Sequence, residues 1–121
     1  MTLGEKQRLF VHLIGKLIIW AYDNDYEFSF GETVRDKRIA SLNASSGIGI
    51  SNSLHLIRLA IDLNLFVDSS IDSDEDVYAT DSNEYKVLGD YWKSLHPLCR
   101  WGGDFSKPDG NHFSMEHEGV K

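Results

Sequence analysis

Residues 54–67, Leu-His-Leu-Ile-Arg-Leu-Ala-Ile-Asp-Leu-Asn-Leu-Phe-Val, form an apolar-rich run whose conformation decides the fold. Read as a strand, the run places five large apolar side chains on one face: Leu59, Ile61, Leu63, Leu65 and Val67. Read as a helix, it has an apolar stripe opposite three polar residues: His55, Arg58 and Asp62. Because periodicity alone does not separate a short buried strand from a short buried helix, both alternatives stay open.

The segments on either side of this run have clearer patterns. Thr2-Leu3-Gly4-Glu5 fits a capping box, and apolar residues at helical spacing then predict a helix from Glu5 to about Tyr22. Alternating aromatic and polar residues predict a strand over 26–30 that ends at Gly31. Residues 84–95 predict a second helix, ended by Pro97, and we expect His112 and Phe113 in a short strand.

Two segments are predicted to be loops. Residues 43–53 are rich in Ser, Gly and Asn, whereas residues 36–43 are compatible with a short helix. The tract from Asp68 to Glu84 contains seven acidic residues and no basic one, which is typical of a solvated surface loop. It does not fit an EF-hand, because Val77 and Asn83 stand where that loop needs Gly and Glu. Weak cation binding by the tract stays open.

Composition limits the classes of protein. A chain of 121 residues is one ordinary domain, so we expect a single domain over 1–121. With 12 basic and 19 acidic residues its net charge is −7, which argues against nucleic acid as a partner. Cys99 is the one cysteine, so a disulfide within the chain and Cys-rich zinc sites are excluded.

The most apolar N-terminal stretch, Leu9–Trp20, argues against export and membrane insertion. It is too short to span a bilayer, and it lacks the basic run and cleavage site of a signal peptide. We therefore expect a soluble protein made in the cytoplasm. We also expect it to be a monomer.

Two motifs resemble those of the zinc D-alanyl-D-alanine carboxypeptidases, a family that includes the phage L-alanyl-D-glutamate endopeptidases. The segment Ser53-Leu54-His55-Leu56-Ile57-Arg58-Leu59-Ala60-Ile61-Asp62-Leu63 resembles the family pattern Ser-x-His-x-x-Gly-x-Ala-x-Asp-Leu. Downstream, Trp101-Gly102-Gly103-Asp104-Phe105 and Asp109-Gly110-Asn111-His112-Phe113 resemble Trp-Gly-Gly-Asp followed by Asp/Glu-x-x-His-Phe. Taken singly, each motif is also compatible with a surface salt-bridge row, a half-buried histidine or an aromatic turn.

The resemblance implies an α+β fold in which helices flank an antiparallel sheet, similar to the hedgehog and D-Ala-D-Ala-peptidase architecture. It also implies a Zn²⁺ ion held by His55, Asp62 and His112. Imidazole nitrogens and carboxylate oxygens are ligands that zinc accepts, and three of them leave a position for water. In the same way Asp109 is implied as the catalytic carboxylate, and Arg35 as the cation that polarises the scissile carbonyl or holds a substrate carboxylate.

Four further residues are expected to support this site or its substrate. We expect Ser53 to orient His55, Trp101 and Phe113 to pack beneath the site, and Asp104 to hold a loop. Glu116 is the reserve candidate for the catalytic carboxylate if Asp109 is misplaced.

The spacing between His55 and Asp62 tests the implied ligand set. Seven residues span ~23 Å in a strand and ~10 Å in a helix, whereas donor atoms on one zinc lie ~3–4 Å apart. The chain must therefore bend between the two residues. Many relatives carry Gly where this chain has Arg58, which puts the local turn in doubt, and we expect the Arg58 side chain to reach solvent.

The resemblance therefore predicts a zinc peptidase that hydrolyses an amide bond in the peptide stem of bacterial peptidoglycan. The L-Ala–D-Glu bond is the first choice, in a phage or prophage endolysin that acts on the wall after release through a holin-type pore. One alternative is a peptidoglycan- or peptide-binding module of the same fold that has lost catalysis. Another is an acidic intracellular interaction protein, which would explain the tract Asp68–Glu84 but not the paired motifs.

Overall fold

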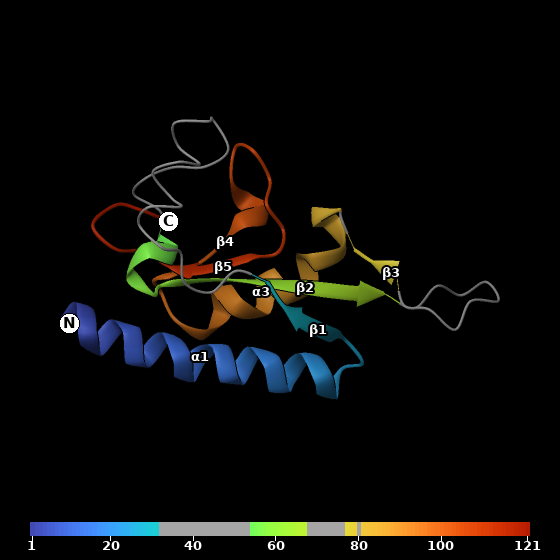
Figure 1. Ribbon diagram of the computed structural model, residues 1–121, viewed down its shortest axis with the longest axis horizontal. Helices are drawn as coiled ribbons and strands as arrows, with labels where there is room; N and C mark the ends of the chain where they lie inside the picture. The colour runs from blue at the N-terminus through green and yellow to red at the C-terminus, as the bar shows by residue number, and fades with distance from the viewer. Residues whose placement is uncertain (32–53, 68–76, 80) are drawn as a thin grey trace.

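The computed structural model describes residues 1–31, 54–67, 77–79 and 81–121 (Figure 1). Its elements are, in chain order, α1 (Leu3–Asp23), β1 (Glu27–Phe30), the 3₁₀ helix η1 (Leu54–Ile57), β2 (Ala60–Val67), β3 (Val77–Tyr78), the 3₁₀ helix η2 (Ser82–Tyr85), α3 (Lys86–Leu95), β4 (Cys99–Trp101), the 3₁₀ helix η3 (Gly102–Asp104) and β5 (His112–Met115). Within these residues, no helix is long and apolar enough to cross a bilayer.

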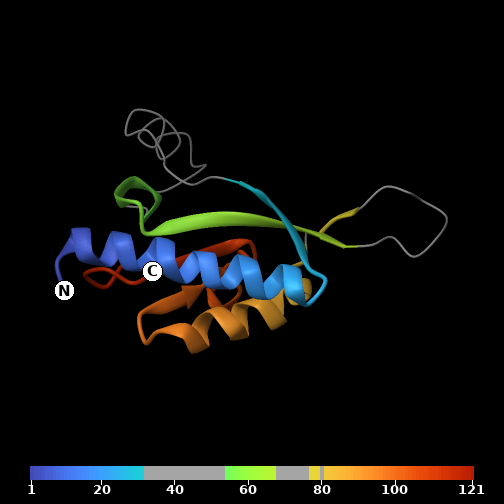
Figure 2. The same cartoon turned by 90° about the horizontal axis from the view of Figure 1, so that it is seen from below.

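The strands form one antiparallel sheet in the order β1-β2-β5-β4, and β3 pairs with the end of β2. The central strand β2 is shared, because its first residues pair with β5 and its later residues with β1 and β3. Helices α1 and α3 contact each other and lie side by side in Figure 2. The predicted α+β class, with an antiparallel sheet and flanking helices, is confirmed.

Helix α1 begins as its sequence predicts, with both hydrogen bonds of the capping box. The Thr2 hydroxyl accepts from the Glu5 N–H, and the Glu5 carboxylate accepts from the Thr2 N–H. The helix runs from Leu3 to Asp23, slightly beyond the predicted range at both ends. Its buried face consists of Lys6 and the apolar residues Phe10, Leu13, Ile14, Leu17 and Ala21.

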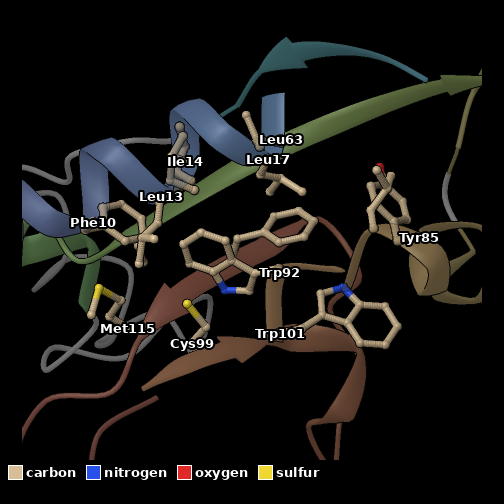
Figure 3. Close-up of a cluster of buried hydrophobic side chains, with 14 of the residues drawn as sticks. Phe10, Leu13, Ile14, Leu17, Leu63, Tyr85, Trp92, Cys99, Trp101 and Met115 are labelled. Atoms are coloured by element: carbon tan, nitrogen blue, oxygen red, sulfur yellow. The ribbon is translucent and has the colours of Figure 1, made fainter. Parts of the chain in front are cut away.

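Trp92 of α3 is at the centre of the apolar core (Figure 3). Its ring meets Phe10 of α1 edge-on at 5.8 Å and Phe113 of β5 at 6.3 Å between centroids. The Trp92 Nε1–H donates to the backbone oxygens of Arg100 and Ser114, so its polar atom is satisfied inside the core. Both helices therefore pack through one aromatic residue against the same face of the sheet.

The open alternative for residues 54–67 is resolved in favour of a strand preceded by a short helical turn. Residues 54–57 form η1, and 60–67 form β2. Along β2 the burial alternates: Ile61, Leu63 and Leu65 are buried, whereas Asp62 and Asn64 are partly exposed. The predicted strand faces are therefore correct from Ile61 to Leu65.

The acidic tract is only partly described. Residues 68–76 and 80 lie outside the described residues, as do the predicted features at 36–43 and 43–53. Within the described part of the tract, Val77–Tyr78 pairs with the end of β2, and η2 begins at Ser82. The prediction of loop throughout Asp68–Glu84 is therefore wrong for these residues, because strand pairing with β2 and the Asp81 cap of η2 order the backbone.

Candidate metal centre

Three side chains from three different elements converge on the face of β2 opposite the apolar core. They are His55 from η1, Asp62 from β2 and His112 from β5, and we call them the metal cluster. Asp62 Oδ1 lies 3.3 Å from His55 Nε2 and 3.7 Å from His112 Nδ1. One potential ligand atom from each residue falls within 4.8 Å of the other two. The spatial convergence that the resemblance implied is therefore present.

The register of the sheet brings Asp62 and His112 together. The two residues are directly opposite each other in the antiparallel pair β2–β5. Side chains of directly opposed residues point to the same face, with Cβ atoms ~4.5–5.5 Å apart. A shift of one residue would send one of them into the core, so strand pairing specifies this half of the cluster.

A left-handed turn between η1 and β2 brings His55 to the same place. The Leu59 N–H donates to the Leu54 carbonyl at 3.0 Å, and Arg58 between them has φ 59°. This is the geometry of a Schellman-type helix end, which usually carries Gly at the left-handed position. The predicted bend is present, Arg58 adopts it without Gly, and its side chain is exposed as expected.

A side chain of α1 supports the same turn. The Gln7 amide Nε2–H donates to the Ile57 carbonyl at 2.7 Å, which satisfies an oxygen at the end of η1. Sequence reasoning did not identify Gln7, because its partner lies 50 positions away and no local pattern marks such a pair.

The carboxylate of Asp62 indicates what the cluster lacks. Its Oδ1 is buried, and neither imidazole contact has hydrogen-bond geometry, so this oxygen has no hydrogen-bond partner in the described part of the chain. Burial would raise the pKa of Asp62, but His112 and His55 outweigh burial and lower that pKa to about 2. A buried, ionised oxygen without a donor, facing two imidazoles, fits a divalent cation with nitrogen and oxygen ligands.

Asp109 lies beside the metal cluster on a tight loop. Its N–H donates to the Gly102 carbonyl at 2.9 Å, and its own carbonyl accepts from the His112 N–H at 3.1 Å. A Cβ at Gly102 would clash with the backbone oxygen of Asp109 and lie 2.8 Å from His112 Cβ, so only glycine fits there. The glycine of the motif Trp101-Gly102-Gly103-Asp104 thus allows Asp109 and His112 to lie close together.

The surroundings of Asp109 suit a general base. Burial, and then the nearby charge of Asp62, raise the pKa of Asp109. A raised pKa makes a carboxylate a better proton acceptor near neutral pH. Asp109 also lines a pocket of about 220 Å³ together with Ser82, Tyr85 and Asn111, among others. A ligand in that pocket would therefore contact Asp109.

Two of the supporting residues hold the loop that carries Asp109. The Trp101 indole N–H donates to the Gly110 carbonyl at 2.7 Å, and Asp104 forms an ion pair of 2.8 Å with Lys93 of α3. Phe113 is fully buried in the core behind the metal cluster. The roles of Trp101, Phe113 and Asp104 in supporting the site stay predictions.

The structure does not place the three remaining candidate residues at the metal cluster. Glu116, the reserve carboxylate, is paired with Arg100 at 3.4 Å, and Asp109 rather than Glu116 is in electrostatic contact with the metal cluster. Arg35 and Ser53 lie outside the described residues.

Comparison with known proteins agrees with this geometry. A family model described as D-alanyl-D-alanine carboxypeptidase matches residues 47–115. No curated protein matches the chain at a significant level. Because the family match spans more than half of the chain and contains the whole metal cluster, the chain belongs to the D-alanyl-D-alanine carboxypeptidase family of zinc peptidases.

Proposed function

We propose that this protein is a zinc peptidase that hydrolyses an amide bond in the peptide stem of bacterial peptidoglycan. The observation that carries the proposal is the metal cluster itself, in which Asp62 Oδ1 faces two imidazoles and receives no hydrogen bond from the described residues. A structural ion pair would leave no buried oxygen without a donor, whereas a metal ligand has that oxygen free for the ion.

His55, Asp62 and His112 would hold the ion. A zinc ion held there would lower the pKa of a water molecule and polarise a carbonyl group. Asp109 then accepts a proton from the attacking water on its carboxylate oxygen and delivers it to the nitrogen of the leaving amine. The raised pKa of Asp109 suits both steps. We assign Arg35 to the scissile carbonyl or to a substrate carboxylate, on the resemblance alone.

The resemblance to phage L-alanyl-D-glutamate endopeptidases favours the L-Ala–D-Glu bond as the bond that is cut. On that basis we propose a monomeric phage or prophage endolysin, made in the bacterial cytoplasm and released to the wall through a holin-type pore. Only the peptidoglycan-directed zinc peptidase rests on the family match.

The test combines metal removal with product analysis. Purified protein is treated with a chelator, reloaded with zinc, and incubated with peptidoglycan sacculi, and mass spectrometry identifies the released fragments. We expect no release without metal, recovery with zinc, and new L-Ala C-termini and D-Glu N-termini. Activity that survives complete chelation would overturn the metal mechanism, and cleavage at D-Ala–D-Ala would overturn only the choice of bond.

His55→Ala and His12→Ala are a matched pair for this test, since His12 is exposed on α1 and outside the metal cluster. His55→Ala is expected to lose stoichiometric zinc binding and hydrolysis, whereas His12→Ala keeps both. A protein that binds zinc and sacculi but releases nothing would instead be the inactive binding module of the same fold.

A further inference from the structure

The outer nitrogen of His112 contacts the backbone of the segment that follows β5. His112 Nε2 lies 3.2 Å from the backbone oxygen of Lys121, and the Ser114 hydroxyl donates to the same oxygen at 2.9 Å. A backbone oxygen only accepts hydrogen bonds, so His112 Nε2 must carry a hydrogen in this contact. In the neutral ring the lone pair is then on Nδ1, which is the atom that faces Asp62.

Residues 116–121 are held in place by their own turn. His117 and Val120 exchange two backbone hydrogen bonds of 2.9 Å each. The two residues between them have positive φ, 49° at Glu118 and 81° at Gly119. Two successive left-handed residues between paired ends are typical of a type I′ hairpin turn, where Asn-Gly is the favoured pair.

Helix α1 holds the other end of this segment. Lys6 is 9% exposed, and its ammonium donates to the Glu116 carbonyl at 3.2 Å and to His117 Nδ1 at 3.0 Å. Since an ammonium has only donors, the ring nitrogen of His117 accepts. The segment is thus held at its start by α1, closed by its turn, and joined at its end to His112.

We propose that residues 116–121 are a positioning segment for His112. The Lys121 backbone oxygen holds the His112 ring as the Nε2–H tautomer and directs Nδ1 toward Asp62, and Ser114 keeps that oxygen in place. Partners on the outer nitrogen of a ligating histidine set its orientation, and their loss typically weakens metal affinity ~10–100-fold. The role in metal affinity rests on the proposed zinc site, whereas the tautomer does not.

Gly119→Val tests the proposal, because a β-branched residue at φ 81° breaks the turn without touching the metal cluster. Long-range ¹H–¹⁵N spectra of the metal-free full chain report the His112 tautomer, and competition with a chelator gives the zinc dissociation constant. We expect a single Nε2–H tautomer in the parent, a mixture in Gly119→Val, and ~10-fold weaker zinc binding. Ser114→Ala, which removes one hydrogen bond, is expected to shift both readouts less in the same direction.

Two further variants separate positioning from general stability. Glu118→Asn places a residue that tolerates positive φ in the turn and should keep the parental tautomer and zinc affinity. Asp25→Val puts comparable strain at φ 67° between α1 and β1, so it lowers stability but leaves the tautomer unchanged. If Gly119→Val and Ser114→Ala both keep the parental tautomer and affinity, the proposal is overturned. If the parent itself binds no zinc, the proposed function fails. The His112 tautomer in the parent and in the variants then tests the positioning segment by itself.

Discussion

The two faces of β2 differ in chemistry: one packs into the apolar core, and the other carries a carboxylate of the metal cluster. One face consists of Ile61, Leu63 and Leu65, which are at most 7% exposed and pack into the core beneath α1 and α3. The other face carries Asp62, whose Oδ1 is buried without a hydrogen-bond partner in the described part of the chain. One strand thus combines fully satisfied packing with a polar atom left unsatisfied.

This difference shows how stability and chemistry are divided within a few ångströms. Burial of apolar side chains on the core face supplies the free energy that orders the strand. That order holds Asp62 opposite His112, where the two imidazoles compensate the burial of its carboxylate. The core face therefore supports a polar face that is adapted to bind an ion, and substitutions on the two faces should have different consequences.

The largest expected effect is the loss of metal binding in Asp62→Ala. The variant removes the carboxylate between the two imidazoles, so we expect stoichiometric zinc binding to disappear in isothermal titration calorimetry. The free energy of unfolding of the metal-free protein, measured by urea denaturation, should change less than in Leu63→Ala. Unchanged zinc binding would remove the proposed site.

Asp109→Ala separates catalysis from metal binding on the polar side. A positioned general base contributes ~10²–10⁴-fold to a rate, so the rate of sacculus hydrolysis should fall by that factor while zinc affinity is retained. Glu116→Ala is the matched control, since Glu116 is paired with Arg100. Near-normal turnover in Asp109→Ala with a large loss in Glu116→Ala would transfer the role to Glu116.

Leu63→Ala tests the core face of the same strand. Leu63 is fully buried, and truncation of a buried leucine to alanine costs about 2–5 kcal/mol. Urea denaturation should show this loss, and the folded fraction should still bind one zinc ion, because the side chain lies on the opposite face. Loss of zinc binding in a fully folded Leu63→Ala protein would contradict the division between the faces.

The smallest expected effect concerns the turn at Arg58, which connects η1 to β2. Arg58 has φ 59°, a conformation that disfavours residues with a Cβ, whereas Gly adopts it freely. We expect Arg58→Gly to raise the free energy of unfolding by about 0.5–1 kcal/mol, after the entropy that Gly adds to the unfolded chain. Arg58→Lys keeps the strain and serves as the control. A destabilised Arg58→Gly protein would show that the Arg58 side chain contributes contacts of its own.

The sequence predicted the elements whose determinants are neighbours in the chain. Thr2 and Glu5 begin α1 through hydrogen bonds three residues apart, and the alternation from Ile61 to Leu65 identifies both faces of β2. The family motifs also identified the three residues of the metal cluster and Asp109. Such short-range patterns are readable because each depends on the local geometry of one helix or strand.

Contacts between separate elements could not be obtained in this way. The pairing of Asp62 with His112 depends on strand register, the contact of Gln7 with Ile57 spans 50 positions, and Lys121 reaches His112 through a backbone oxygen that every residue type carries. Arg58 occupies a position that usually requires Gly, so packing on both sides of the turn overrides its local preference. Local chemistry therefore specified which side chains can bind a metal, whereas long-range pairing and packing, which no single segment encodes, specified where their atoms meet.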